Sequence, residues 1–370
     1  MALGDKLPVV MGKEKAVANG VATLDSDGKL AEEQRPTTDP APTQDSDNPV
    51  QSGGVYTALA GKADLTLSNL SNYQKALRNI GGRPNSNLLD NAYFKGGGSQ
   101  QGGGQFPINQ RGQTSYGAGY GMDRWVSNSC TVSIQSDGIL ISGSANYGNL
   151  SQIIDNPSRF AGMTVTLSAL ILGGSGISNG AYLNLQINGT DHVTNMSQGL
   201  VSVTVTCPSQ ITNMQAAFVT SPFSGYSLQV IAAKLELGSH QTLAYQDEDG
   251  AWQLFETPDY GEELDKCLFY LEIQNIPINA FIPANVWSGN SGECAFCLQY
   301  ANKRITPTIS FSGGGRFVPY SSSQVNLTSF FTEAATPSAA GISATLSENL
   351  TGGGAGFVDS LGQVIISAEL

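Results

Sequence analysis

Histidine and cysteine side chains, which could supply acid–base or metal chemistry, are few and scattered in this chain of 370 residues. His192, in a predicted turn, and His240, just after a predicted strand, lie far apart in sequence. Cys294 and Cys297 have the spacing of half a zinc site, but no second cysteine pair or histidine lies near them. Residues three apart on a strand also face opposite sides of a sheet. These residues therefore predict neither a catalytic centre nor a metal site.

Two acid-rich turns are the remaining places for catalysis. Residues 247–249 are Asp-Glu-Asp, and residues 261–265 read Gly-Glu-Glu-Leu-Asp. Two carboxylates flanking a glycosidic bond can hydrolyse a polysaccharide, so these turns keep a hydrolase open as the alternative. The oxygen-rich side chains of the same turns could also bind a structural Ca²⁺, although the sequence does not assign its ligands. Acid clusters in turns are more often solvated surface, and nucleophile-elbow, phosphate-loop, zinc-protease and dinucleotide motifs are missing. We therefore predict a protein without catalytic residues and without a required cofactor.

Aromatic side chains offer a different chemistry, the recognition of sugars. A flat ring stacks on the apolar face of a sugar, while fixed hydroxyl and amide groups bond its hydroxyls. Residues 114–125, TSYGAGYGMDRW, place aromatic rings among glycines that would expose them. The tryptophan also stands at the start of a predicted strand, where a core position is the competing interpretation. The candidate glycan-binding residues are Tyr116, Tyr120, Trp125, Trp287, Phe317 and Tyr320.

The overall composition argues against several partners. The chain has 18 basic and 30 acidic residues and a formal net charge of −12. It therefore lacks the basic surface that nucleic acid or anionic lipid would require. No apolar run is long enough for a signal peptide or for a membrane span of about 20 residues. The five cysteines, an odd number, offer no disulfide framework. We expect a chain that is made and folded in a cytoplasm and does not insert into a membrane.

The elements that would position these side chains are mainly β-strands. From residue 85 onward, short segments alternate apolar and polar residues, and Gly, Asn, Asp, Ser or Pro separates them. Consecutive strands without intervening helices predict an antiparallel jelly-roll β-sandwich over residues 85–262. A second set of strands predicts a smaller C-terminal β-sandwich, a tip domain, over residues 263–370.

The first 84 residues follow another pattern. Residues 1–45 contain a short hairpin or extended piece and a proline-rich linker, and residues 46–84 contain two short predicted helices. Helices shorter than ~12–15 residues are marginal alone, but three copies could bury their apolar seams against one another. The competing interpretation packs both helices on the sandwich as ordinary surface elements. The predicted seam of a trimeric coiled-coil stalk consists of Val55, Leu59, Leu70, Tyr73, Leu77 and Ile80.

Several motifs resemble those of tailed-bacteriophage tail fibres and receptor-binding proteins. The stretch NPVQSGGVYTALAGKADLTLSNLSNYQKALRNIGG is similar to the segment that connects the parts of such fibres, and GVATLDSDGKLAEEQ resembles the short units upstream of it. NLLDNAYF, FPINQRG and DRW, followed by AAKLELGSHQTLAYQDEDGAWQLFETPDYGEELDKCLFY, resemble their jelly-roll module, which is similar to carbohydrate-binding modules. KRITPTISFSGGG is similar to the opening of their C-terminal domains. The last ~55 residues resemble nothing that we can name.

The resemblance implies a structural virion protein, made in the host cytoplasm and assembled as a homotrimer in the tail fibre. Its N-terminal region would attach to phage tail or baseplate proteins, and its distal part would bind a glycan on the host cell surface. We expect residues 275–370 to dominate host choice, with the jelly roll as a second contact. The alternative is a trimeric tailspike-like enzyme, a polysaccharide depolymerase or deacetylase, although the long β-helix typical of depolymerases is missing. A bacterial surface adhesin is disfavoured because no signal peptide or anchor is recognised.

Overall fold

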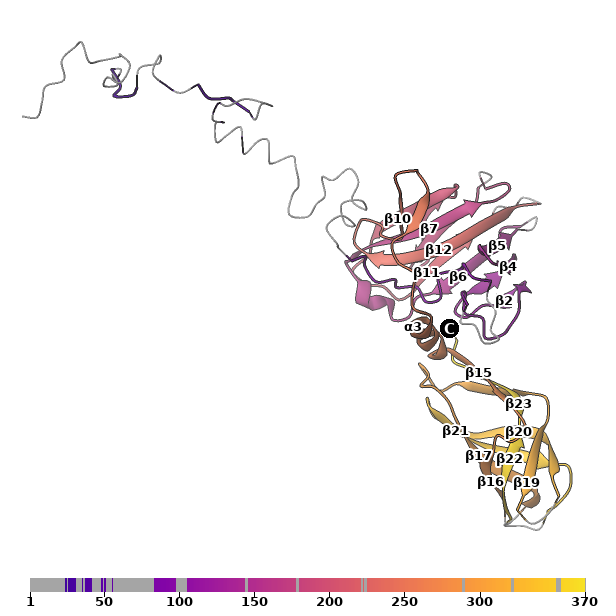
Figure 1. The fold of residues 1–370 in the computed structure, drawn as a ribbon. Coiled ribbons are helices and arrows are strands. Elements are labelled where there is room, and N and C mark those ends of the chain that lie inside the picture. The colour runs from indigo at the N-terminus through magenta and orange to yellow at the C-terminus, as the bar shows by residue number, and fades with distance from the viewer. Residues whose placement is uncertain are drawn as a thin grey trace, which may run out of the picture. The chain divides into compact units, whose positions relative to one another are not determined.

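The structure of the chain is a computed structural model (Figure 1). It describes residues 24, 26–30, 35, 37–41, 48, 50, 55, 83–97, 105–143, 146–177, 180–220, 222, 225–287, 290–320, 323–350 and 354–369. The chain divides into two compact units, Met1–Ala76 and Leu77–Leu370.

The first unit contains a small turn at the position of the predicted hairpin. An antiparallel bridge joins Leu24 to Leu30, and Gly28, at φ +74°, adopts the left-handed conformation between them. Val55 of the predicted stalk is helical and exposed. The other five stalk residues, Leu59, Leu70, Tyr73, Leu77 and Ile80, lie outside the described residues. The trimeric stalk therefore stays a prediction.

The second unit begins with twelve strands. They are β1 (Ser115–Tyr116), β2 (Gly119–Tyr120), β3 (Val126–Asn128), β4 (Thr131–Gln135), β5 (Gly138–Ser142), β6 (Asn149–Ile153), β7 (Thr164–Gly173), β8 (Tyr182–Ile187), β9 (Thr190–Asn195), β10 (Gly199–Thr206), β11 (Met214–Val219) and β12 (Ser227–Leu237). They form two six-stranded sheets, ordered β1-β4-β5-β12-β7-β10 and β2-β3-β6-β11-β8-β9. Neighbouring strands pair antiparallel throughout. The predicted mainly β, antiparallel fold is confirmed, and we call this part the sandwich.

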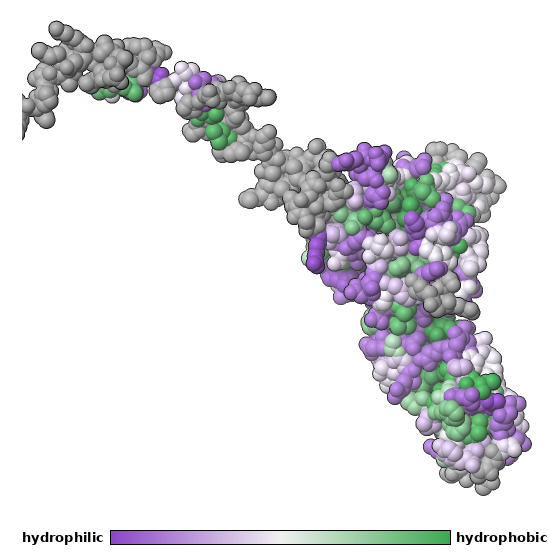
Figure 2. Space-filling model, in the orientation of Figure 1, coloured by the Kyte–Doolittle hydropathy of each residue, from purple (hydrophilic) through white to green (hydrophobic). Residues whose placement is uncertain are grey.

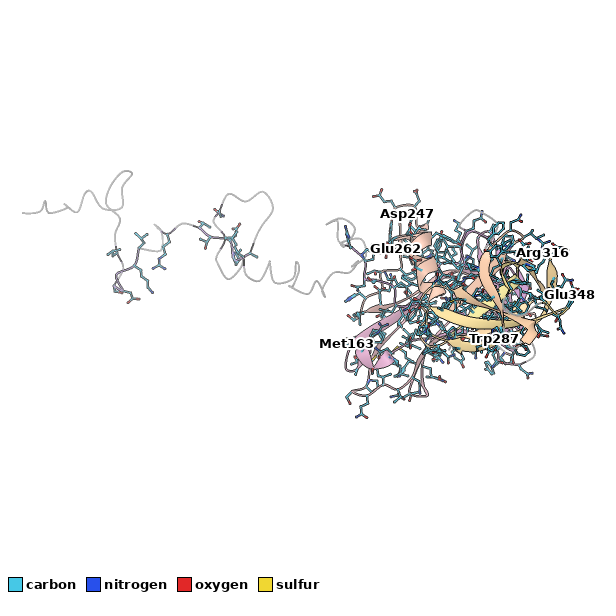
Figure 3. All side chains as sticks on the ribbon, turned by 90° about the horizontal axis from the view of Figure 1, so that it is seen from below. Met163, Asp247, Glu262, Trp287, Arg316 and Glu348 are labelled. Atoms are coloured by element: carbon cyan, nitrogen blue, oxygen red, sulfur yellow. The ribbon has the colours of Figure 1, made fainter. Side chains whose placement is uncertain are left out.

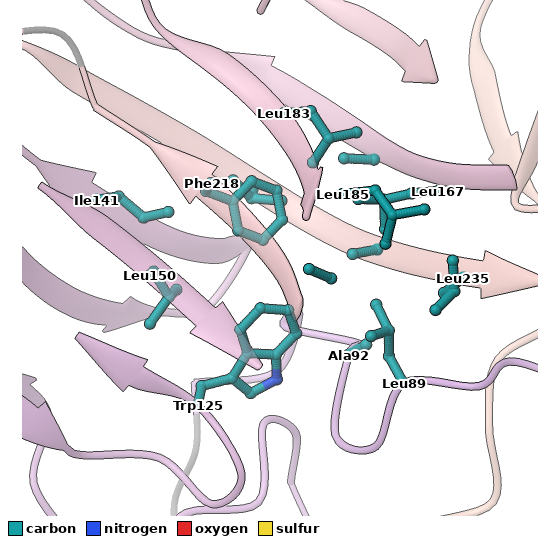
Figure 4. Close-up of a cluster of buried hydrophobic side chains, with 14 of the residues drawn as sticks. Leu89, Ala92, Trp125, Ile141, Leu150, Leu167, Leu183, Leu185, Phe218 and Leu235 are labelled. Carbon is teal, nitrogen blue, oxygen red and sulfur yellow. The ribbon is translucent and has the colours of Figure 1, made fainter. Parts of the chain in front are cut away.

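A single hydrophobic core fills the sandwich (Figure 4). Alternation along each strand supplies it: in β4, for example, Val132 and Ile134 are buried, whereas residues 131, 133 and 135 are not. Trp125 is fully buried at its centre, 5.4 Å from Phe94 between ring centroids. The indole Nε1 donates a hydrogen bond of 2.9 Å to the carbonyl of Asn91, which satisfies its one polar group.

A connecting region follows the sandwich, and its hairpin packs on the outer face of the first sheet, where Leu243 and Ala244 meet Leu170 and Ala232. It contains the hairpin β13 (Ala244–Gln246) and β14 (Trp252–Leu254) and the helix α3 (Tyr260–Leu268). Asp259 caps α3 by accepting a hydrogen bond of 3.0 Å from the amide of Glu262. The predicted boundary between residues 262 and 263 thus falls inside a helix. A separate 3₁₀ turn, η3 (Pro157–Phe160), lies within the sandwich.

The remaining strands form a closed barrel and a small sheet. Their bounds are β15 (Leu271–Ile276), β16 (Ile282–Trp287), β17 (Asn290–Gln299), β18 (Thr308–Ser312), β19 (Gly315–Pro319), β20 (Val325–Ala335), β21 (Ala339–Leu346), β22 (Ala355–Ser360) and β23 (Gly362–Ser367). The barrel order is β16-β17-β21-β20-β19-β22, and β15-β23-β18 is a three-stranded sheet. This part has its own core, centred on residues such as Phe317 and Ile342. It is a barrel rather than the predicted second sandwich, because β22 pairs with both β16 and β19 and so leaves no edge.

Gln110 of the sandwich bonds to β15. Its side-chain Nε2 donates to the carbonyl of Leu271 at 2.9 Å and to Asp123 Oδ2 at 2.6 Å, and its Oε1 accepts from the amide of Ile273 at 3.1 Å. Asp123 is fully buried, and burial raises the pKa of its carboxyl to about 7.

Among the described helices, none is long and apolar enough to cross a membrane.

Candidate functional site

Three of the six aromatic candidates are core residues. Trp125 and Phe317 are fully buried, and Tyr116 is 8% exposed. The glycines around Tyr116 do not expose it as predicted: a Cβ on Gly121 would lie 2.1 Å from the Tyr116 ring, so the ring covers that glycine. Burial also raises the pKa of Tyr116. A ring without accessible surface cannot stack on a sugar, which corrects the expectation for these three residues.

The other three candidates retain accessible surface. Tyr120 is half-buried, the guanidinium of Arg111 lies 5.6 Å from its ring centroid, and burial raises its pKa. Trp287 and Tyr320 are exposed by 47% and 76%. Both lie in the barrel region, where Figure 3 labels Trp287.

Tyr320 belongs to a group of aromatic rings on the outside of the barrel. The ring centroids of Phe281 and Phe357 are 4.7 Å apart, and those of Phe357 and Tyr320 are 6.0 Å apart. Phe281 is 57% exposed and Phe357 is half-buried between its neighbours. We call Phe281, Phe357 and Tyr320 the aromatic face. Hydrophobic residues are also visible on the barrel surface in Figure 2.

Three adjacent strands position the aromatic face. Phe357 of β22 is in register with Pro283 of β16 on one side and with Val318 of β19 on the other. Residues 356 and 358 of β22 point into the core, so Phe357 points outward. Gly356 allows β19 to approach closely, because a Cβ there would lie 2.4 Å from the carbonyl oxygen of Val318.

A cleft adjoins the aromatic face. Its volume is about 830 Å³, and it lies where β15 and the facing ends of β16 and β17 come together. Phe281 and Pro283 contribute both to this cleft and to the surface around Phe357. The lining residues are Gln274, Asn275, Ile276, Pro277, Ala280, Phe281, Ile282, Pro283, Cys297, Leu298 and Gln299.

The sandwich has a pocket of its own, of about 380 Å³, between β12 and the connecting region. Lys234 lines it and is almost fully buried; its Nζ donates to Thr242 Oγ1 at 3.0 Å and lies 3.9 Å from a carboxylate oxygen of Glu236. Glu236 in turn accepts from the amide of Thr242 at 2.5 Å. Burial lowers the pKa of Lys234 and raises that of Glu236. These charged groups are occupied in holding the connecting region against the sheet.

The two acid-rich segments are likewise occupied by structural hydrogen bonds, and residues 261–265 lie in the helix α3 and not in a turn as expected. Asp247 accepts from the amides of Asp249 and Ala251, at 3.1 and 2.8 Å, within the β13–β14 turn. Glu263 accepts from the amide of Asn91 at 2.8 Å and forms an ion pair with Lys266. Figure 3 marks both regions through Asp247 and Glu262.

No metal site is apparent in the part of the chain that the structure describes, where three or more His, Cys, Asp or Glu side chains nowhere gather suitably. His192 lies in β9 opposite Leu185, not in the predicted turn. Cys294 is buried, which raises its pKa to about 12, whereas Cys297 is exposed on the opposite side of β17. The structural Ca²⁺ stays a prediction without assigned ligands.

Sequence reasoning missed Phe281 and Phe357. Phe357 and Val358 are consecutive apolar residues on one strand, so one of them must face away from the core. That local signal could have selected Phe357. Phe281 stands just before a strand, and its proximity to Phe357 depends on strand pairing that the sequence does not reveal.

Comparisons with known proteins identify no family for the chain. The sequence matches no protein-family model and no curated protein. Among solved structures, the chain is similar to the N-terminal CBM22-1-CBM22-2 tandem domain from Paenibacillus barcinonensis Xyn10C. The match has 11% sequence identity and a TM-score of 0.24, and it covers 78% of this chain and 99% of the other.

Proposed function

We propose that this protein binds a glycan through the aromatic face of its barrel, without catalysis, as the receptor-binding protein of a phage tail fibre. The observation that carries the proposal is the exposure of three neighbouring rings, Phe281, Phe357 and Tyr320. Two of them keep more than half of their surface in water. Exposed apolar surface of this kind contributes little to folding and commonly marks a binding site.

This surface is better suited to binding a sugar than to binding a charged protein. The rings offer flat apolar faces for stacking, and the exposed end of Tyr320 carries a hydroxyl that can donate and accept hydrogen bonds. Trp287 lies at the same end of the barrel as Tyr320, since the amide of Val286 bonds Gly354 and that of Tyr320 bonds Ala355. A glycan that extends along the face would thus meet further aromatic surface.

The tail-fibre assignment and the homotrimer rest on the motifs of residues 20–84 and their resemblance to tail-fibre segments. A trimer would present three copies of the aromatic face. Stacking at one site is weak, but simultaneous engagement of three sites raises the overall affinity by orders of magnitude. The N-terminal region would then attach the protein to phage tail or baseplate proteins.

The binding test compares two exposed tyrosines. Tyr320→Ala removes part of the aromatic face, whereas Tyr147→Ala removes a tyrosine of the sandwich that is 57% exposed. On surface-immobilised host polysaccharide, Tyr320→Ala should lower retention of the full chain about tenfold, and Tyr147→Ala should leave it unchanged. Equal retention of both variants would contradict the proposal.

Two further measurements address the assembly and the absence of catalysis. Light scattering should give a mass near three times 38.7 kDa, and Leu70→Asp combined with Leu77→Asp should lower it, because the charges would be buried in the seam without partners. Incubation with host polysaccharide should release neither reducing sugar nor acetate. Release of either would favour the tailspike-like enzyme instead.

A further inference from the structure

The cleft beside the aromatic face differs from the sandwich pocket in that none of its lining residues is charged. We propose that this cleft extends the same binding site and restricts it to uncharged glycans, discriminating against sugars that carry carboxylate or phosphate groups. The inference rests on the proposed function, since the aromatic face must first hold the glycan.

The cleft and the aromatic face share residues and therefore form one continuous surface. Phe281 lines the cleft and contacts the ring of Phe357. Pro283 lines the cleft and is the register partner of Phe357. A sugar chain stacked on Phe357 can therefore continue past Phe281 into the cleft.

Charged groups near the cleft are already paired. Glu272 accepts from the Nζ of Lys303 at 2.8 Å, and the Lys303 side chain is fully buried. Asp359 forms an ion pair with Arg316. A carboxylate or phosphate entering the cleft would lose hydration without gaining a cation, and desolvating an unpaired charge is costly.

Amide groups supply the polar contacts of the cleft. The Nε2 of Gln274 donates to Glu272 Oε1 at 2.7 Å and to the carbonyl of Gln299 at 2.9 Å, which fixes the orientation of that amide. The side chains of Asn275 and Gln299 are exposed at the cleft. Amides both donate and accept, so they can exchange hydrogen bonds with sugar hydroxyls without desolvating a charge.

The loop that carries Phe281 is held in a specific conformation. Asn279 and Phe281 have positive φ angles of 71° and 55°, which are uncommon for asparagine and rare for a bulky residue. The amide of Asn279 donates to Asp359 Oδ1 at 2.5 Å, and that of Ala280 donates to the carbonyl of Asp359 at 3.1 Å. The ring is thereby placed between cleft and face before any ligand arrives, which lowers the entropy lost on binding.

The experiment uses pairs of oligosaccharides that differ only in charge. The full chain is tested on an array that pairs neutral hexose oligomers with the corresponding uronic acid oligomers of equal length and linkage. We expect at least one neutral member to bind about tenfold or more tightly than its uronic acid partner. Its retention should also change little as salt is raised, because no ion pair forms.

Gln299→Lys tests the cleft directly, with Gln210→Lys as its control. Gln210 is exposed on the sandwich and, like Gln299, has a hydrogen bond at its backbone carbonyl. Gln299→Lys should reduce the preference for the neutral partner several-fold, and Gln210→Lys, with the same added charge, should not.

The outcomes separate the two proposals. If Tyr320→Ala weakens binding but wild-type protein binds uronic acid partners equally or better, the inference about the cleft is wrong and the aromatic face stands. If Gln299→Lys shifts the preference no more than Gln210→Lys, the cleft does not set the selectivity. Binding that Tyr320→Ala leaves unchanged, or no binding to any pair, overturns the proposed function together with this inference.

Discussion

The pocket of the sandwich and the cleft of the barrel differ in how they use polar and charged groups. Beside the sandwich pocket, Lys234 is buried and bonds to Thr242, and it lies 3.9 Å from Glu236, which is buried behind the lining and also bonds to Thr242. These two charges bond the connecting region to the sheet, whereas Glu256 and Lys266 of the pocket lining keep exposed surface. In the barrel, uncharged amides and exposed rings surround the cleft. These groups contribute little to the free energy of folding.

This comparison shows that the presence of charged groups in a pocket does not identify a ligand site. Burying a charge is unfavourable unless it is paired. Buried charged groups in a folded protein are therefore usually bonded to other groups of the same protein. The aromatic face presents the opposite case, because its apolar rings are exposed to water and a ligand that covered them would lower the free energy of the protein. The barrel is therefore the better candidate for binding, although the sandwich has the more enclosed pocket.

Removal of a buried charge should produce the largest effect on stability. Glu236→Ala leaves the buried Lys234 ammonium with only the largely exposed Glu256, at 3.9 Å, as a carboxylate partner, and it deprives Thr242 of two hydrogen bonds. We expect a loss of about 3–5 kcal/mol in the free energy of unfolding. Gln299→Ala at the barrel cleft should change it by less than about 0.5 kcal/mol. Urea denaturation followed by circular dichroism measures both, and similar losses would remove the distinction between the two regions.

Asp123 should make stability depend on pH. Burial raises its pKa from 3.8 to about 7, while hydrogen bonds from Gln110 and the charge of Arg111 lower it and Glu369 raises it. A raised folded-state pKa means that the stabilisation is complete below about pH 3.8 and is lost as the pH rises through 7. At about 1.4 kcal/mol per unit, the loss amounts to at most about 4 kcal/mol.

Asp123→Asn isolates this contribution, because asparagine does not ionise. The free energy of unfolding of wild-type protein should fall more steeply between pH 4 and 7 than that of the variant. Parallel pH profiles of the two proteins would show that Asp123 keeps an ordinary pKa.

Fold class could be predicted because its signal is local. Alternation such as that of β4, with Val132 and Ile134 inside, can be read from five consecutive residues. Closure of the barrel could not be predicted, because it requires β16 to pair with β22, about 70 residues later in the chain. Strand pairing over such distances leaves no mark in either segment alone.

Only part of the candidate site could be predicted, because the rest of it also depends on long-range strand pairing. Tyr320 was selected from its own type and context, but its neighbours Phe281 and Phe357 are brought to it by the barrel. The error at Tyr116 has a different origin. Its neighbour Gly121 was expected to expose the ring, whereas the missing side chain leaves room for the ring to lie over the backbone. A glycine near an aromatic residue is therefore an ambiguous signal.

Replacing the central ring of the aromatic face should separate binding from stability. Phe357→Leu keeps an apolar side chain but removes the flat ring that contacts both Phe281 and Tyr320. The free energy of unfolding should fall by about 1–3 kcal/mol, in line with the loss of two aromatic pairs worth about 0.5–1.5 kcal/mol each. Affinity for the neutral oligosaccharide should fall more, by about tenfold or beyond, in a titration of the intact chain. A variant that loses stability but keeps its affinity would assign the ring a packing role only.

The three tryptophans allow the two regions to be compared in a single sample, with the smallest perturbation. Trp125 is buried in the sandwich, whereas Trp252 of the connecting region is 37% exposed and Trp287 of the barrel is 47% exposed. Acrylamide should quench the two exposed indoles and spare Trp125. If the glycan binds the barrel, saturating neutral oligosaccharide should reduce the quenching of Trp287, which lies at the Tyr320 end of the aromatic face. Trp287→Phe should abolish this protection and Trp252→Phe should preserve it, because only the first removes the indole near the ligand. Protection that disappears with Trp252→Phe instead would place the glycan on the sandwich, where that indole lies over Gly199 of β10.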